Sequence, residues 1–521
     1  MKGFITGTLL MVLAYGAQAQ VTFNQQVDFG EFGFPFHVLT SVLPTDSCYY
    51  ATGIISDTTD GFFAYGGIFV KFDLQGEMLF FKKLTSPDRD YFLWRGDLVA
   101  TPDGNLVDIG ITVDSITRGI LIKYSPQGDT LFTREYLHPF YPTESFLYAA
   151  GLKVARTDRI MALFGVDTDT SSGISNMDSY LLTLDPLGNI LDSNIYGDNI
   201  KENPKRLVMA GDGGVLVPSI RTNSNLVNMN YVSRAHVFKV DTLGKKEWEY
   251  LTPQGQLFNF ASDLTLAPDG GLVAATGKGI EVMVNAETAI LKWFPYFLKL
   301  DADHKFEWGR EFRGTRPDLF TMDRVVSAAD GSGYVGVSRI GEDVSIGEEV
   351  LGSWLMKVSP EGDSLWARYY SFFDGINARP NPYDLKNTPD GGYVICGETD
   401  PSNIGDIKDG SWLMKVDEHG CLIPGCQLVS TDDLPGQPVK LAIYPNPVSR
   451  FLNFQLRGEV PQLKGGRFRI IDASGRALRE VEDAYPGDTH ILSISEWPSG
   501  TYFLQYILDG QIITSERFIK N

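Results

Sequence analysis

The chain has 521 residues, of which 65 are Asp or Glu and 45 are Lys or Arg, so its net charge at pH 7 is −20. This acidity argues against nucleic acid or an anionic membrane surface as a partner, because both would repel the protein. The length exceeds what one ordinary hydrophobic core covers, which predicts either several domains or an array of repeats.

The first twenty residues have the features of a secretory signal peptide. One lysine is followed by the apolar stretch FITGTLLMVLAYG, and Ala17 and Ala19 form a small-x-small cleavage site before Gln20. The apolar stretch is short for a membrane span, and no later segment reaches the ~20 apolar residues that a span needs. We therefore expect residues 1–19 to be removed, leaving a mature chain outside the cytoplasm without a transmembrane segment. The alternative is an uncleaved N-terminal anchor.

A short turn motif recurs through the body of the chain. An Asp-Gly phrase or a degenerate copy of it, 54–61 residues from the next, places an aspartate at each of Asp46, Asp103, Asp158, Asp212, Asp269, Asp330 and Asp390. A second motif follows each turn at a steady distance, for example MKVSPEG at 356–362 and MKVDEHG at 414–420. Because two independent markers keep the same phase, the sequence predicts seven copies of one structural unit.

Each unit has the pattern of four short β-strands rich in Val, Ile, Leu, Tyr and Trp. We expect the small-residue segment GYVICGE (392–398) to lie nearest a crowded axis, followed outward by SWLMKV (411–416). A SLWARYY-type strand (364–370) and a YDLKNT-type strand (383–388) come next. No helix-length segment with a 3.6-residue period is found in the body. These features predict an all-β fold with a seven-bladed β-propeller over residues 20–426.

The seventh unit ends near residue 426 without a fourth strand. The segment PFHVLTSVLPTDS (35–47) precedes the first unit and is similar to LFTMDRVVSAADG (319–331). We expect residues 35–47 to supply the missing strand, so that the two ends of the propeller meet in one blade and no open edge remains. The alternative is an open solenoid.

A polar linker at 427–439 ends the repeats, and residues 440–521 read as short alternating strands of a small Ig-like β-sandwich. This segment resembles the type A C-terminal sorting domain of the type IX secretion system. The resemblance is carried by Tyr444, Pro445, Asn446, Pro447, Ser474, Gly475, Arg476, Leu492, Pro498, Ser499, Gly500, Tyr502 and Lys520.

The resemblance implies a two-step export route in a Gram-negative bacterium. The signal peptide would take the chain to the periplasm, and the sorting domain would direct it across the outer membrane to be secreted or held at the cell surface. In this family Tyr444 to Pro447 would organise the first strand, and the C-terminal strands would be read by the translocon, the expected partner. The body resembles bacterial propellers with degenerate PDG-type repeats, a likeness that implies a fold and no shared chemistry.

The chain has four cysteines. Cys421 and Cys426 are close enough in sequence to form a local disulfide after export, and we favour this over a metal site, which would need two further ligands. Only His419 lies nearby. The pairing of Cys48 and Cys396 stays open.

A calcium site is conceivable at 167–178, where Asp167, Asp169 and Ser171 alternate as oxygen ligands do. An EF-type loop requires Gly at its sixth position and Glu at its twelfth, and this segment has Ser172 and Asp178 there. We therefore favour a solvated loop and expect no cofactor.

No catalytic motif is found, since G-x-S-x-G and H-E-x-x-H are both absent. Long, variable connections such as 166–179 and 372–383 fall on one face of the propeller and the tight turns on the other, and variable loops on a rigid scaffold commonly bind ligands. We therefore predict a binding or interaction module for an extracellular glycan or protein. The alternatives are a carbohydrate-active, glycosidase-like enzyme and a passive structural surface protein.

Overall fold

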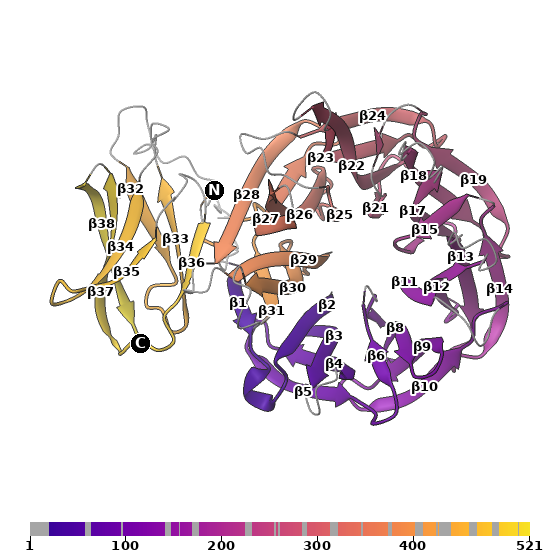
Figure 1. Cartoon of the computed structure of the whole chain (residues 1–521), viewed down its shortest axis with the longest axis horizontal. Coiled ribbons are helices and arrows are strands. Elements are labelled where there is room, and N and C mark those ends of the chain that lie inside the picture. The colour runs from indigo at the N-terminus through magenta and orange to yellow at the C-terminus, as the bar shows by residue number, and fades with distance from the viewer. Residues whose placement is uncertain are drawn as a thin grey trace, which may run out of the picture.

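A ring of seven blades and a separate two-sheet sandwich make up the protein, as the computed structural model shows (Figure 1). Each blade has four strand positions, and in blades 2, 4 and 5 the innermost position is divided into two short strands. This confirms the predicted seven-bladed β-propeller with its C-terminal sandwich. The structure describes residues 20–521 apart from 58–63, 95–96, 141–146, 156, 169–176, 199, 224–231, 255–256, 259–260, 284–288, 313–320, 345–346, 373–377, 402–409, 424–425, 427–438, 458–465, 482–488 and 509.

The first four blades follow one another along the chain. They consist of β2 (Phe36–Pro44), β3 (Tyr49–Asp57), β4 (Ala64–Phe72) and β5 (Met78–Leu84); β6 (Asp90–Phe92), β7 (Val99–Ala100), β8 (Leu106–Val113), β9 (Thr117–Tyr124) and β10 (Thr130–Tyr136); β11 (Leu147–Val154), β12 (Ile160–Asp167), β13 (Met177–Leu184) and β14 (Ile190–Tyr196); and β15 (Lys201–Pro204), β16 (Val208–Met209), β17 (Val215–Asn223), β18 (Val232–Val240) and β19 (Lys246–Leu251).

The last three blades complete the ring. They consist of β20 (Leu257–Phe258), β21 (Asp263–Leu266), β22 (Leu272–Met283), β23 (Ala289–Leu300) and β24 (Phe306–Glu311); β25 (Arg324–Ser327), β26 (Tyr334–Val344), β27 (Gly347–Val358) and β28 (Ser364–Phe372); and β29 (Ala378–Asn387), β30 (Tyr393–Pro401), β31 (Gly410–Val416) and the N-terminal β1 (Phe23–Val27). A short 3-10 turn, η1 (Gly30–Phe32), leads from β1 to β2.

The order of strands within a blade differs from the expected one. In blade 7 the strand nearest the axis is β29, which contains the YDLKNT segment, and β30 with GYVICGE is second (Figure 1). Every blade therefore begins one strand earlier than the sequence pattern indicated. The small and apolar residues of β30 are explained by burial between adjacent blades, since Val394 and Cys396 are both fully buried.

The expectation for residues 35–47 is wrong in the same way. Most of this segment forms β2, the innermost strand of blade 1, which pairs with β3. The outermost strand of blade 7 is instead β1, which pairs antiparallel with β31 from Phe23 opposite Lys415 to Val27 opposite Ser411. A four-strand repeat has no intrinsic starting point, so a segment before the first copy aligns equally well with the end of one unit or the start of the next.

Adjacent blades are joined at their outer strands by a recurring hydrogen bond. A tyrosine at the end of an outermost strand donates its hydroxyl to the carbonyl of a turn glycine in the next blade. Among the residues that the structure describes, the cases are Tyr136 to Gly188 (2.8 Å), Tyr196 to Gly244 (2.6 Å) and Tyr370 to Gly420 (2.5 Å). Between blades 7 and 1, Gln25 of β1 donates its side-chain amide to the Gly76 carbonyl in the same role. The N-terminal strand β1 therefore makes the same contact to the next blade that a fourth strand following β31 in sequence would have made.

Two further contacts close the ring nearer the axis. The Val42 amide of blade 1 donates to the Asp384 carboxylate of blade 7 at 3.1 Å. The Ser411 amide of blade 7 donates to Nδ1 of His37 at 2.9 Å. Burial lowers the pKa of His37 to about 4, so this imidazole is neutral at pH 7 and available as an acceptor.

The two repeated sequence motifs contact each other within a blade. The aspartate of the turn between the first and second strands binds the lysine of the third strand. The pairs are Lys123–Asp103 (2.6 Å), Lys239–Asp212, Lys299–Asp269 (2.7 Å), Lys357–Asp330 (3.8 Å) and Lys415–Asp390 (3.1 Å). In blade 3 the lysine is replaced by Thr183, and in blade 1 Lys71 lies over the Tyr50 ring. The phase of the repeat therefore reflects a physical contact.

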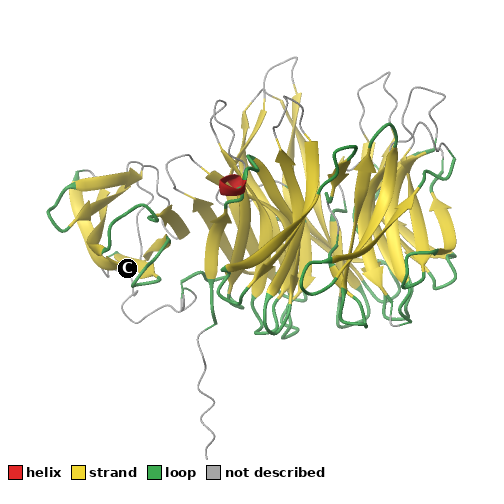
Figure 2. Ribbon diagram, turned by 90° about the horizontal axis from the view of Figure 1, so that it is seen from below, coloured by secondary structure: helices red, strands yellow, loops and turns green. Residues whose placement is uncertain are grey.

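The tight turns lie together on one face of the ring, along the lower edge of Figure 2. They join the first strand to the second and the third to the fourth in each blade. The turn between the third and fourth strands needs a left-handed residue, which is Gly76 (φ 85°) in blade 1 and His304 (φ 62°) in blade 5. The longer connections leave from the opposite face.

The C-terminal sandwich has a three-stranded and a four-stranded sheet. Its strands are β32 (Lys440–Tyr444), β33 (Phe451–Arg457) and β36 (Thr489–Ser493), and β34 (Arg467–Asp472), β35 (Ala477–Val481), β37 (Gly500–Leu508) and β38 (Gln511–Lys520). Fully buried aromatic residues, among them Phe454, Phe468 and Tyr506, form its core.

The sandwich adjoins the propeller at blade 6. β36 runs parallel to β28, with Tyr370 opposite Thr489, so the smaller sheet continues the sheet of that blade (Figure 1). Within the described part of the chain, no helix is long and apolar enough to cross a membrane.

Candidate functional site

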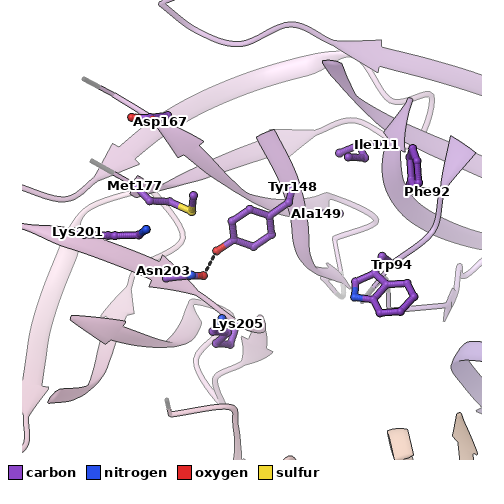
Figure 3. Close-up of a pocket in the computed structure, with 10 residues that line it drawn as sticks. All are labelled: Phe92, Trp94, Ile111, Tyr148, Ala149, Asp167, Met177, Lys201, Asn203 and Lys205. Carbon is purple, nitrogen blue, oxygen red and sulfur yellow. Dashed lines mark hydrogen bonds between the residues drawn. The ribbon is translucent and has the colours of Figure 1, made fainter. Parts of the chain in front are cut away.

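A cavity of about 620 Å³ opens among blades 2, 3 and 4, at strand ends that face away from the tight turns (Figure 3). Its size lies within the range of roughly 300–1,000 Å³ that is usual for small-molecule sites. The residues that line it are Phe92, Trp94, Ile111, Tyr148, Ala149, Asp167, Met177, Lys201, Asn203 and Lys205.

Three of these residues occupy the same position in successive blades. Trp94, Tyr148 and Asn203 each precede the tight turn of their blade by the same number of residues, on or beside the innermost strand. The cavity therefore lies at the mouth of the central channel. No repeated motif marks these side chains, and sequence reasoning missed them. The one hint in the sequence is that this position before the tight turn, unlike the repeated motifs, carries a different residue type in each of these blades: Trp94, Tyr148 and Asn203.

The aromatic wall of the cavity is held in place by contacts between blades. The Tyr148 hydroxyl donates to the Asn203 side-chain oxygen (Figure 3) and lies 2.8 Å from the Pro204 carbonyl oxygen. The Tyr148 ring packs on Gly165, where a Cβ atom would lie only 2.1 Å from the ring. Trp94 contacts Tyr383 of blade 7 with 5.1 Å between ring centroids. The wall is thus positioned before any ligand arrives.

A ring of charged residues closes the channel below the cavity. Three residues further along the innermost strands, or about 10 Å toward the tight turns, the corresponding positions hold Asp97, Arg206, Asp263, Arg324 and Asp384 in five different blades. The Arg206 guanidinium reaches across the axis to Asp97 at 2.6 Å and Asp384 at 2.8 Å, and lies 3.6 Å from Asp263. The side chains of Asp97 and Asp384 are only 2% and 1% exposed.

Electrostatics keep this charged ring ionised despite its burial. Burial alone would raise the pKa of Asp97, but the positive charges of Arg206, Lys153 and Lys386 outweigh it and hold the pKa well below its usual range. The pKa of Asp384 is lowered by Lys386 and Arg206 in the same way, against the effect of burial. The charges of Asp97, Asp384 and Arg206 therefore depend on one another, and neither Asp97 nor Asp384 is free to act as an acid near pH 7.

Asp108 of β8 is a buried carboxylate whose pKa shifts in the opposite direction. Its side chain is fully buried, and burial raises its pKa to about 7, with a further contribution from Asp97 and Asp384. The folded protein therefore binds the Asp108 proton more tightly than the unfolded chain does. The contribution of the protonated Asp108 carboxyl to the free energy of unfolding is complete below about pH 4 and is lost as the pH rises through 7.

Replacing Asp108 with asparagine is therefore expected to stabilise the protein above pH 7 by up to the order of 4 kcal/mol, because no buried carboxyl has to ionise. The gain should shrink toward zero near pH 4. Thermal unfolding between pH 4 and 8 measures it, with Asp129→Asn in an exposed turn as the control. Equal gains at both ends of this range would contradict the assignment.

The described residues among those singled out in the sequence do not gather at one site. Cys421 and Cys426 are joined by a disulfide with 5.6 Å between their Cα atoms, and Cys48 and Cys396 are free and buried. Ala17, Ala19 and most of the 167–178 loop are outside the described residues, while Asp167 lines the cavity. Among the described residues no group of three His, Cys, Asp or Glu could hold a metal ion.

Asn446 and Gly500 of the C-terminal sandwich both contact its last strand, β38. The Asn446 side chain accepts from the Ile519 amide at 3.0 Å and donates to the Arg517 carbonyl at 3.1 Å. Gly500 pairs with Lys520, which is 8% exposed.

The other motif residues have local roles. The Tyr502 hydroxyl donates to the Pro498 carbonyl at 2.7 Å. Gly475 has φ 84° in the turn after β34, and Leu492 is buried in the core. Peptide bonds Tyr444–Pro445 and Asn446–Pro447 are both cis.

A comparison with protein families matches residues 442–521 to the family described as "Secretion system C-terminal sorting domain". This segment is a type IX secretion sorting domain. It marks the protein for secretion or display at the surface of a Gram-negative bacterium and implies an interaction with the type IX machinery. The sorting domain covers only the end of the chain and gives no activity to the propeller. A comparison with curated proteins finds no match.

Several solved structures are similar to the chain at low identity. The polysaccharide lyase Uly1 is 7% identical, with 73% of this chain and 90% of that chain covered and a TM-score of 0.46. An α-L-arabinanase from Penicillium chrysogenum, complexed with arabinobiose, is 12% identical over 62% and 92% of the chains, with a TM-score of 0.40. The NanB sialidase from Streptococcus pneumoniae is 8% identical over 77% and 70%, with a TM-score of 0.39.

Proposed function

We propose that the protein is an exported binding module whose propeller takes its ligand at the cavity at the mouth of the central channel. The observation that carries the proposal is the preformed aromatic wall of Phe92, Trp94 and Tyr148 above a channel that buried charges close. A ligand would enter from the face of the long connections and rest against rings that need no rearrangement. Preorganised aromatic surfaces bind at low entropic cost.

Binding fits the cavity better than hydrolysis does. Glycosidases of the usual kind need a pair of carboxylates that flank the scissile bond. Of the described residues that line the cavity, Asp167 alone is acidic. Asp97, Asp263 and Asp384, deeper in the channel, are buried against Arg206, so they support the fold rather than a reaction.

Replacing Trp94 with alanine is expected to weaken binding about tenfold or more, because the ligand loses a stacking surface. The full chain would first be screened on a glycan array and with pooled chromogenic glycosides, with and without calcium, and the strongest ligand then titrated. Phe306→Ala, which removes an exposed ring from the outermost strand β24, is the matched control and should bind normally. Turnover of any glycoside would contradict a binding module and support the enzyme, and binding unaffected by Trp94→Ala would contradict this site.

A further inference from the structure

The cavity contains a lysine, Lys201, that has no counterion among the residues that the structure describes. Lys201 lies on β15, two residues before Asn203, so that both side chains project from the same face of the strand into the cavity (Figure 3). Its ammonium group has neither a hydrogen bond nor an ion pair with any residue that the structure describes. Five lysines of the repeated motif, by contrast, are bound to a carboxylate, as Lys123 is to Asp103.

This arrangement is unusual for a chain with a net charge of −20, in which acidic partners for a lysine are abundant. A partly buried ammonium group loses hydration, and an anion or several acceptors must compensate for that loss. Lys205, which also lines the cavity, adds a second positive charge on the same side (Figure 3). The ligand is therefore expected to bring a negative charge.

The rest of the wall limits what else the ligand carries. Asp167 lies in the same cavity and would repel a multiply charged group such as a polyphosphate, whereas it accepts hydrogen bonds from hydroxyls. Asn203 accepts from Tyr148 through its carbonyl oxygen, which leaves its NH₂ group to donate to a ligand. Phe92, Trp94 and Tyr148 offer flat apolar faces, against which the C–H faces of a sugar ring pack well.

We propose that the ligand is an acidic saccharide, whose single carboxylate or sulfate group binds Lys201 while its rings rest on the aromatic wall. This inference rests on the proposed function and names the chemical class of the ligand. An anionic group on a polyhydroxylated ring satisfies Lys201, Asn203 and Asp167 together. A neutral sugar would leave Lys201 without a counterion. The multiple negative charges of a nucleotide would be repelled by the Asp167 carboxylate.

The test compares matched acidic and neutral oligosaccharides on the purified full chain. The pairs are galacturonate and galactose, glucuronate and glucose, and sulfated and unsulfated galactose oligomers, so that carboxylate and sulfate are scored separately. We expect the acidic member of at least one pair to bind tenfold more tightly or better, since a charge-assisted hydrogen bond has about that value. The best ligand is then titrated calorimetrically against three variants.

Lys201→Met should abolish the preference by lowering affinity for the acidic sugar about tenfold, with little effect on the neutral one. Lys201→Arg should keep it, because the charge remains. Lys305→Met, in a turn on the opposite face with its side chain 75% exposed, should change nothing. Trp94-dependent binding of neutral sugars without an acidic preference, or a preference that survives Lys201→Met, would overturn this inference and leave the proposed function intact. Absence of binding to every saccharide would overturn both.

Discussion

Replacing Arg206 with methionine is expected to destabilise the propeller by roughly 3–5 kcal/mol, the range found when one partner of a buried ion pair is removed. The substitution keeps the volume and removes the charge. Asp97 and Asp384 would then be buried beside fewer cations, and Asp263 would lose a neighbouring positive charge. Because these three aspartates and Arg206 belong to four different blades, the loss should affect the whole ring at once.

The dependence on pH separates this mechanism from simple loss of packing. Without Arg206 the pKa of Asp97 should rise toward the range that burial alone favours, so the variant gains stability as the pH falls and its carboxylates take up protons. The difference in Tm between Arg206→Met and the parent protein should therefore narrow between pH 8 and pH 5.

Two companion variants make the result specific to the charged ring. Adding Asp384→Asn to Arg206→Met should recover part of the lost stability, since one uncompensated charge disappears. Arg134→Met, on the exposed outer strand of blade 2, should stay close to the parent protein. A constant difference in Tm across this pH range, or no recovery in the double variant, would contradict the assignment.

Deleting residues 20–27 is expected to destabilise the protein and cause it to associate, because it removes β1 and exposes β31. All seven residues of β31 are buried. The deletion also removes the hydrogen bond from Trp412 Nε1 to the Asn24 side chain (2.6 Å) and the contact between Gln25 and Gly76. An unpaired apolar strand edge readily pairs with another chain. We expect a Tm lower by about 4 °C or more, which corresponds to a few kcal/mol in a propeller of roughly 400 residues.

Thermal unfolding and size-exclusion chromatography measure the two effects. A synthetic peptide of residues 20–29 should bind the shortened protein and restore part of its stability, because the site on β31 remains. Val21→Ser, at a 38% exposed position just before β1, is the control and should behave like the parent protein. An unchanged Tm together with a monomeric elution volume would mean that β1 does not close the ring.

The number of blades could be predicted from the sequence because the two repeated motifs contact each other. The Asp269–Lys299 ion pair is one example: both partners must keep their positions for it to form. The boundaries of the blades could not be predicted in the same way. Residues 35–47 resemble an innermost strand and a missing outermost strand equally well, and only the pairing of β1 with β31 distinguishes the two.

The candidate site was harder to predict than the fold. Trp94, Tyr148 and Asn203 belong to no motif, and the contact that joins Tyr148 to Asn203 links two blades 55 residues apart in sequence. Their only common feature is their position relative to the tight turn, which becomes meaningful once the blades are arranged around an axis. The sorting domain, by contrast, was easy to predict from the sequence. Its motif residues all lie within residues 442–521, and together they identify the family.

The ion pair between the turn aspartate and the third-strand lysine lies within a single blade, whereas the outer tyrosine contacts join neighbouring blades. A gene segment encoding one blade can therefore be copied with its own internal ion pair complete, and only the contacts to its neighbours must adapt afterwards. GSWLMKV occurs unchanged at 352–358 and 410–416, in the third strands of blades 6 and 7. Duplication of one blade would explain the repeated sequence. The sequence stays similar at positions whose contacts lie within a blade, and it differs at positions that contact a neighbouring blade or a ligand.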